Sequence, residues 1–530
     1  MNYTQLSFWI LFLLVHGVYW RVGHRRQNQL LLVASYFFYG FWDYRFLFLI
    51  LISTVVDFIG GLGVAGVRLP RARLLRLGAL VLGAAFVLCV PWRAHPHRLV
   101  DFAVPLATAG VIALYGAALP RLYRGPQRRK WFLVISMVAN LGLLGFFKYC
   151  DFFISSAHDL LAALGLAHAP APLLHILLPA GISFYTFQAM SYTIDIYRGA
   201  VEPTDDFGDF ALFVCFFPHL VAGPIMRAHT LLPQVMRPRT RRPGDFEEGL
   251  ALVVIGLFKK IALSDNMATI ANAIFYRLAD GATASMSGAE VLVGVYAFAF
   301  QIYGDFSGYS SIARGISKWL GFDLVVNFHL PYLATSPSDF WRRWHISLST
   351  WLRDYLYVPL GGNRHGRRRE YRNLMLTMLL GGLWHGARWT FVAWGLYHGL
   401  ILCIYRLAGI RDVSPREHFG RWLVRVVVMF HLTCAGWLLF RADHFGAVAR
   451  AASLMATHFV ITQTALTAAA LITFYAGALF ILELVTDGEG RIRRLLESSP
   501  AVQGAVYGYL VSMTLFFHAR RAYEFLYFQF

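Results

Sequence analysis

Long apolar segments separated by short and mostly basic loops run through the whole sequence, and this alternation restricts the fold classes open to the chain. An α-helix needs about 20 mostly apolar residues to cross the hydrocarbon part of a membrane. We expect about 11 to 13 membrane-spanning helices, with the shorter segments forming re-entrant or interfacial helices. The apolar segments are residues 4–20, 29–43, 46–66, 75–92, 101–119, 131–149, 174–196, 209–224, 248–264, 288–304, 370–386, 388–407, 421–440, 464–486 and 505–520.

The composition agrees with a membrane protein and disfavours a soluble one. Charged residues make up 15% of the chain, whereas a soluble chain has about 25%. The predicted fold is therefore all-α, a polytopic integral membrane helical bundle. Because no internal repeat and no long hydrophilic segment is visible, residues 1–530 are predicted to form a single membrane domain. Half-crossing segments are tolerated only where protein or a cavity surrounds them, which points to a central cavity.

The charge distribution excludes nucleic acid as a partner and suggests an orientation. The net charge is +19, but the basic residues are scattered between apolar segments, whereas a nucleic-acid binder gathers them on one solvated face. By the positive-inside rule, the basic clusters at 21–26, 68–76 and 121–130 face the cytoplasm and the N-terminus lies outside.

The first apolar segment lacks a basic leader and a cleavage site, so we expect it to be retained. Lys259 and Lys260, near the end of the apolar segment 248–264, are candidates for chemistry, or they snorkel toward the interface.

Polar, aromatic and glycine residues crowd together in residues 300–400, which we interpret as the catalytic core segment. The part from Ser336 to Trp351 predicts one amphipathic helix, and Ser336 or Ser338 can cap its start. Its aromatic residues form a stripe typical of an interfacial helix, with two arginines toward the head groups. His345 lies beside this stripe and is a candidate for chemistry.

A second histidine, His385, lies in residues 379–389, at the end of an apolar segment. Gly382 and Gly386 form a small-xxx-small pair that lets another helix backbone approach closely, so His385 would lie in a tight helix contact. A neutral imidazole can act there as a general base, because its ordinary pKa of about 6.5 suits proton transfer near neutral pH. The alternative is a histidine whose ring simply binds a backbone carbonyl. Together with His345, the sequence favours a catalytic pair.

Other kinds of site find less support. The loop with Gly361, Gly362 and Asn363, followed by arginines, either binds the phosphates of a nucleotide-like donor or only marks the cytoplasmic side. The sequence has no P-loop, G-x-S-x-G, H-E-x-x-H or C-x-x-C motif. We therefore expect no metal and no tightly bound cofactor.

Four segments of the central region carry specific motifs: Gln301-Ile-Tyr-Gly-Asp305-Phe-Ser-Gly-Tyr309, Asn327-Phe-His-Leu-Pro331-Tyr, Phe340-Trp-Arg-Arg-Trp344-His345-Ile-Ser and Gly381-Gly-Leu-Trp384-His385-Gly. These segments resemble the membrane-bound O-acyltransferase family, and more narrowly its bacterial alginate O-acetylation branch. Weaker similarities cover much of the remaining chain.

The resemblance implies roles for particular residues. His385 would be the catalytic histidine and His345 its partner, meeting in a tunnel that is open to a donor from the cytoplasm and to an acceptor from outside. An aromatic tail around Tyr527 is similar to one in this branch, and its hydroxyl could carry the acyl group as a temporary nucleophile; the alternative is that the tail only anchors the end of the chain. The residues expected to bind substrate are Asp305, Tyr309, Trp344, Asn363 and Trp384.

The resemblance thus implies a membrane-bound O-acyltransferase of the bacterial cytoplasmic (inner) membrane. It would move an acyl group, acetyl by preference, from acetyl-CoA or an acyl-carrier thioester in the cytoplasm to hydroxyls of an extracytoplasmic polysaccharide, either directly or through a periplasmic acyltransferase partner. The acceptor would be alginate-like or another envelope glycan. One alternative is a transporter or exporter that uses Asp57, Asp195, Asp305 and the histidines as a proton path without covalent chemistry. Another is a non-enzymatic scaffold for envelope assembly.

Overall fold

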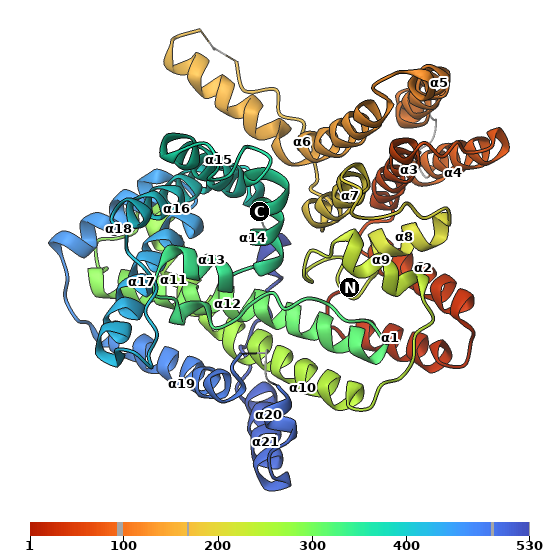
Figure 1. The fold of residues 1–530 in the computed structure, drawn as a ribbon. Helices are drawn as coiled ribbons and strands as arrows, with labels where there is room; N and C mark the ends of the chain where they lie inside the picture. Colours follow the sequence, from red (N-terminus) through yellow and green to blue (C-terminus); the bar gives the residue numbers. More distant parts are fainter. Residues whose placement is uncertain (93–98, 167–168, 489–491, 529–530) are drawn as a thin grey trace. The chain divides into compact units, whose positions relative to one another are not determined.

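Helices make up the regular secondary structure throughout the part of the chain that the structure describes. This computed structural model describes residues 1–92, 99–166, 169–488 and 492–528, and no β-strand occurs among them (Figure 1). Backbone contacts divide the chain into two compact units. The first consists of Met1–Val221, Ile225–Arg241 and Leu320–Asp323, and the second of Ala222–Pro224, Arg242–Trp319 and Leu324–Phe530. The single domain over residues 1–530 stays a prediction.

The all-α membrane fold is confirmed. Within the described residues, seven helices are long and apolar enough to cross a membrane, and Leu6–Tyr19 is a shorter apolar helix. The seven are Phe46–Ala65, Arg71–Cys89, Ala103–Arg124, Arg128–Ala163, Trp389–Leu407, Phe419–Arg441 and Gln463–Leu484. Several other predicted segments form helices that are shorter or more polar. The larger number of spans and the central tunnel therefore stay predictions.

The first unit is arranged around α3, whose contacts include α6 and α7. Small residues allow this packing, because a Cβ at Gly63 would lie 2.4 Å from the Phe132 ring and one at Gly61 would lie 2.4 Å from the Tyr192 ring. The helices of this unit are α1 (Leu6–Tyr19), α2 (His24–Gly40), α3 (Phe46–Ala65), α4 (Arg71–Cys89), η1 (Leu99–Phe102), α5 (Ala103–Arg124), α6 (Arg128–Ala163), α7 (Ile182–Tyr197), α8 (Phe207–Cys215) and α9 (Ala228–Met236).

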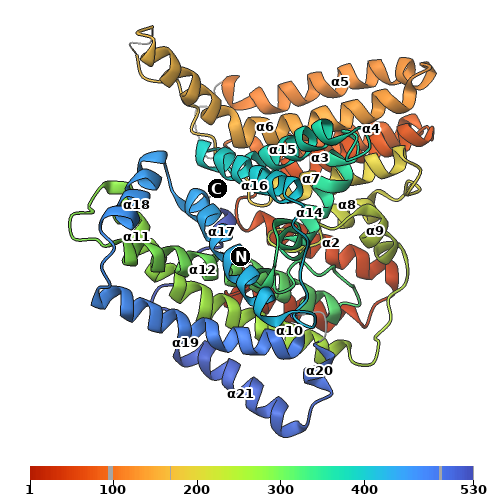
Figure 2. The same ribbon diagram turned by 60° about the vertical axis from the view of Figure 1, so that its left-hand side comes forward.

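The second unit is arranged around α12, the long helix that α10, α11, α17, α18 and α19 contact (Figures 1 and 2). It contains every residue that the sequence proposed for the site. Its helices are α10 (Asp245–Leu257), η2 (Phe258–Ser264), α11 (Asp265–Asp280), α12 (Gly288–Trp319), η3 (Pro331–Leu333), α13 (Pro337–Arg343), α14 (Ile346–Leu352), η4 (Arg353–Tyr357), α15 (Arg367–His385), α16 (Trp389–Leu407), α17 (Phe419–Arg441), α18 (Phe445–Thr457), α19 (Gln463–Thr486), α20 (Arg493–Leu496), α21 (Pro500–Phe516) and η5 (Leu526–Phe528).

Glycines bring α10 and η2 directly against the backbone of α12. A Cβ at Gly308 would lie 2.8 Å from the carbonyl oxygen of Gly256, and a Cβ at Gly256 would lie 2.7 Å from that of Gly308. Gly304 meets the carbonyl oxygen of Lys259 in the same way, at 2.8 Å. Such close approach requires small residues on both helices. It places the two lysines of η2, a short π-helix, against the middle of α12.

A second close approach fixes the end of α15 against α16. A Cβ at Gly382 would lie 2.3 Å from the carbonyl oxygen of Phe391, and a Cβ at Gly395 would lie 2.3 Å from that of Met378. The predicted close helix contact at Gly382 is therefore confirmed, whereas Gly386 meets the Phe391 ring and not a backbone. His385 is the last residue of α15, so this contact determines where its imidazole lies.

Candidate active site

His345 lies in a break between two short helices, and the prediction of one helix from Ser336 to Trp351 is wrong. Ser336 does cap the start, since its hydroxyl accepts a hydrogen bond from the Asp339 N–H at 3.1 Å, but α13 then ends at Arg343. His345 adopts a left-handed conformation with φ 43°, which is uncommon for a residue with a side chain and ends the helical path. The peptide groups at the break bind another segment instead: His329 N–H donates to Arg343 O, and Ile346 N–H donates to Asn327 O.

Asn327 holds the His345 ring, a role that the sequence did not suggest. Its Oδ1 lies 3.2 Å from His345 Nδ1 and accepts hydrogen bonds from the Ser347 N–H at 3.2 Å and the Ser347 hydroxyl at 2.9 Å. The Asn327 Nδ2 donates to Ser310 Oγ at 3.2 Å. The Ser347 N–H can only donate a hydrogen bond, so the Asn327 amide must turn its oxygen, and not its nitrogen, toward Ser347 and His345. The Nδ1 atom of His345 must then carry the proton, which leaves a lone pair on Nε2.

The charge state of His345 follows from its surroundings. The side chain is fully buried, and burial lowers the pKa of His345 to about 3, so the imidazole is neutral near neutral pH. A neutral ring with its proton on Nδ1 can accept a hydrogen bond at Nε2 but cannot donate one there. The only sequence signal for Asn327 was that it begins Asn327-Phe-His-Leu-Pro331-Tyr, one of the four segments that resemble the acyltransferase family.

His385 lies in an aromatic enclosure at the end of α15. Its ring centroid is 5.1 Å from that of Trp384, 5.0 Å from Trp394 and 5.4 Å from Phe440, all in edge-on arrangements. The imidazole is buried, with 3% of the residue surface exposed. An enclosure of this kind excludes most water and strengthens electrostatic interactions within it.

The aromatic tail brings Tyr527 to both histidines. The Tyr527 ring centroid is 5.6 Å from that of His385 and 6.5 Å from that of His345. Trp384 also lies near both imidazoles, at 5.1 Å from His385 and 6.1 Å from His345. The Tyr527 hydroxyl is buried, and burial followed by the nearby Asp305 charge raises its pKa, so the phenol stays protonated. Three groups that can exchange protons thus meet in one place.

The other predicted substrate-binding residues are distributed around this cluster. Asp305 accepts a hydrogen bond from the Leu526 N–H of the tail at 2.6 Å. Tyr309 packs against Phe525 with ring centroids 4.6 Å apart. Asn363, in contrast, is exposed in the loop between η4 and α15. That these residues bind substrate stays a prediction, but for Asp305 and Tyr309 the structure shows contacts with the tail.

The aromatic stripe does not lie at an interface, so that expectation is wrong. Phe340 and Trp344 are almost completely buried, and their stacked rings are 5.7 Å apart. Trp344 also lies 4.8 Å from the Trp437 ring of α17. Helix α17 and the other neighbouring helices cover the stripe, which no property of the segment's own sequence could reveal.

The two lysines of η2 do not snorkel either. Lys259 and Lys260 have 1% and 2% of their surfaces exposed. Lys259 Nζ pairs with Glu483 at 2.9 Å, and Lys260 Nζ pairs with Asp265 and Asp305 at 2.8 Å each. Buried charges of this kind are tolerated because they are paired.

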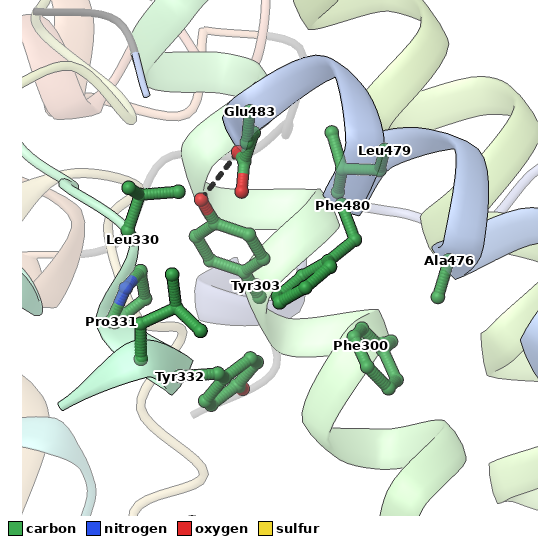
Figure 3. Close-up of a pocket in the computed structure, with 10 residues that line it drawn as sticks. Phe300, Tyr303, Leu330, Pro331, Tyr332, Ala476, Leu479, Phe480 and Glu483 are labelled. Carbon is green, nitrogen blue, oxygen red and sulfur yellow. Dashed lines mark hydrogen bonds between the residues drawn. The ribbon is translucent and has the colours of Figure 1, made fainter. Parts of the chain in front are cut away.

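An apolar pocket opens beside the Lys259–Glu483 pair, between α12, α19 and the segment around η3 (Figure 3). Its polar end is the Glu483 carboxylate, which accepts a hydrogen bond from the Tyr303 hydroxyl at 2.5 Å. Tyr303 and Tyr332 line the pocket and also pack against Trp344, each at 6.2 Å. Trp344 therefore supports the pocket wall on one side and precedes His345 in the chain.

Known proteins share this central region. The family described as MBOAT, membrane-bound O-acyltransferase family, matches residues 204–440, which include both histidines. The chain is 38% identical over 447 residues to "Probable alginate O-acetylase AlgI" of Pseudomonas aeruginosa, a match that covers 84% of this chain and 72% of that protein. It is 37% identical over 371 residues to "Peptidoglycan O-acetyltransferase" of Helicobacter pylori, covering 64% and 68%. It is 29% identical over 236 residues to "Teichoic acid D-alanyltransferase" of Streptococcus thermophilus, covering 42% and 56%.

Proposed function

Because this chain belongs to the membrane-bound O-acyltransferase family, we propose that its paired histidines transfer an acetyl group from a cytoplasmic thioester to a hydroxyl of an extracytoplasmic polysaccharide. The family and the named relatives make the chain a multi-pass membrane O-acyltransferase that acts on envelope polysaccharides. A transporter without covalent chemistry is accordingly not favoured.

One observation carries the proposal: His345 and His385 both lie against the Tyr527 ring, although they come from different elements of the fold. An acyltransferase needs a base that removes the proton of a hydroxyl and returns it to the leaving thiolate. Imidazole suits both steps, because it can accept and donate a proton near neutral pH. The aromatic enclosure of His385 keeps water from competing with the acceptor hydroxyl.

In the proposed reaction, His385 removes the proton as the acceptor oxygen attacks the thioester carbonyl carbon. A carbon–oxygen bond forms, the carbon–sulfur bond of the tetrahedral intermediate breaks, and the leaving thiolate takes the proton from His385. His345 orients the acceptor hydroxyl through Nε2, the ring nitrogen that does not carry the proton. His345 could instead steady charge on the thioester carbonyl, but a neutral ring with its proton on Nδ1 favours the orienting role.

Tyr527 provides an acceptor hydroxyl inside the protein, and we propose that it carries the acyl group between donor and polysaccharide. Its phenol is protonated and needs a base, and His385 lies beside it. The thioester would first acetylate the Tyr527 oxygen and release a thiol. A polysaccharide hydroxyl, or the hydroxyl of a periplasmic partner enzyme, would then attack the aryl ester and restore the phenol. Anchoring of the tail remains the competing role for Tyr527.

The donor and the compartment complete the proposal. We propose acetyl-CoA or an acyl-carrier thioester as the donor, reached from the cytoplasm, and the bacterial cytoplasmic (inner) membrane as the location. Asn363 and its exposed loop are proposed to contact the donor's phosphates, because the loop is followed by a run of arginines. Trp384 and Trp344 are proposed to line the path of the acyl group.

The test uses purified protein in detergent with radiolabelled acetyl-CoA, followed by measurement of free thiol and of label on the protein or an added glycan. His385→Ala should lower turnover at least about 10²-fold, the lower range for loss of a general base. His418→Ala removes an exposed imidazole ahead of α17 and is the matched control. Full activity in a folded His385→Ala protein would remove His385 from the mechanism.

A second variant, Tyr527→Phe, tests the acyl relay. Label that is found on Tyr527 in the wild-type protein and is absent from Tyr527→Phe would support the relay. Transfer at the normal rate in Tyr527→Phe would show that the tail is only an anchor.

A further inference from the structure

The tail that carries Tyr527 is held at a buried cluster of charges, and we propose that this cluster is a docking site that positions Tyr527 at the histidines. The cluster consists of Lys260, Asp265 and Asp305, and we call it the tail-docking cluster. The proposal rests on the proposed function for the role of Tyr527, but the docking itself does not depend on it.

Two backbone groups of the tail bind the tail-docking cluster directly. The Leu526 N–H donates to Asp305 Oδ2 at 2.6 Å, and the Tyr523 carbonyl oxygen accepts a hydrogen bond from Lys260 Nζ at 2.9 Å. Lys260 Nζ also pairs with Asp265 and with Asp305 at 2.8 Å each. Hydrogen bonds to charged groups are shorter and about twice as strong as those between neutral groups. Because the tail contributes main-chain atoms, these bonds fix its path whatever its side chains are.

Two aromatic residues of α12 that follow Asp305 in the chain, Phe306 and Tyr309, complete the docking site. The Phe306 ring lies 5.8 Å from Phe525 and 4.6 Å from Tyr527, and the Tyr309 ring lies 4.6 Å from Phe525. Phe306 also lies 4.5 Å from the His345 ring, in an edge-on arrangement. One face of α12 therefore binds the tail and supports His345 at the same time.

This arrangement gives the tail-docking cluster a specific consequence for Tyr527. The Leu526 N–H is hydrogen-bonded to Asp305, and Leu526 directly precedes Tyr527. This hydrogen bond therefore determines where the Tyr527 ring lies relative to His345 and His385. The neighbouring Lys259–Glu483 pair is equally buried but binds the Tyr303 side chain of α12. The cluster's residues are thus positioning residues, since they act on the reaction through the tail.

The sharpest test removes the Leu526 N–H without changing the membrane helices. Leu526→Pro lacks this donor, and proline is tolerated because Leu526 is the first residue of η5. Leu526→Ala keeps the N–H and is the matched control. Asp305→Ala removes the acceptor of the Leu526 N–H and leaves the Lys260 cation paired with the Asp265 carboxylate. Tyr303→Phe is its control on the same helix.

Two readouts are measured on the full chain in detergent: chymotrypsin cleavage after Tyr523 or Tyr527, followed by mass spectrometry, and transfer of radiolabelled acetyl groups. We expect Leu526→Pro and Asp305→Ala to be cleaved at least about tenfold faster than their controls, because each loses a charge-assisted hydrogen bond. We expect transfer to fall at least about tenfold in the same two variants.

The outcomes separate the docking site from the chemistry. Cleavage at control rates in both variants would overturn the docking site, and faster cleavage with unchanged transfer would overturn the positioning of Tyr527. If the wild-type protein transfers no acyl group while both variants still lose tail protection, the proposed function fails and the docking site stands.

Discussion

Asn327→Ala removes the acceptor that fixes the His345 ring, and it tests whether the orientation of this imidazole matters. The variant loses the contact of Oδ1 with His345 Nδ1 and both hydrogen bonds from Ser347. A buried N–H left without an acceptor costs about 1–3 kcal/mol, so the free energy of unfolding should fall by that amount because of the Ser347 N–H. The lost hydrogen bond to His345 is worth about 1 kcal/mol, which corresponds to a decrease in kcat/KM of about fivefold or more.

The assay is acetyl transfer at several pH values, combined with thermal unfolding. Asn327→Asp keeps an acceptor for Ser347 but places a carboxylate beside His345, which raises the pKa of this imidazole and should move the acidic limb of the pH profile to higher pH. In a His345→Ala background, Asn327→Ala should change kcat/KM no further, because the two residues act as one unit. Independent, multiplicative effects of the two substitutions would refute the reasoning.

Three further predictions concern His385, the close approach of α15 and α16, and the charge state of His345. His385→Ala should lower kcat at least about 10²-fold, and circular dichroism checks that the helices persist. Gly395→Ala should destabilise the protein by about 1–3 kcal/mol, because its Cβ would lie 2.3 Å from the Met378 carbonyl oxygen, whereas Gly477→Ala has open space and should not; thermal unfolding compares them. The pKa of His345 is lowered to about 3 in the fold and is about 6.5 when unfolded, so the unfolded state binds the proton first and stability falls as the pH drops below 6.5. Unfolding at pH 7 and pH 5 should show a loss from this source of about 2 kcal/mol that His345→Gln lacks, and equal pH dependence in both proteins would contradict it.

Several site features could be predicted from local sequence because local physics determines them. Ser336, one of the two serines expected to cap this helix, does so, since its hydroxyl and the Asp339 N–H that it binds are only three residues apart. The small residue Gly382 indicated a close helix contact, because the absence of a Cβ is itself the property that permits it. Both histidines could be named from their polar surroundings in an apolar chain.

Other features depended on partners far away in the sequence. The break at His345 is stabilised by backbone hydrogen bonds to the segment around Asn327, so the amphipathic pattern of Ser336 to Trp351 could not reveal it. Lys260 lies near the end of an apolar segment, a position from which a lysine can reach the interface, but its side chain is buried against Asp305. The tail reaches that same carboxylate through the backbone of Leu526, a group that every residue except proline possesses.

The sequence by itself therefore determined that the chain resides in a lipid bilayer and that its fold is all-α, because the length and apolar content of each segment decide whether a helix can cross a bilayer. It also determined the kinds of chemistry available, since those depend on which side chains are present. Only the tertiary structure decided which of these groups meet. Contacts such as Asn327 with His345, and Tyr527 with His385, are set by helix packing and burial over long sequence separations, and no local pattern encodes them.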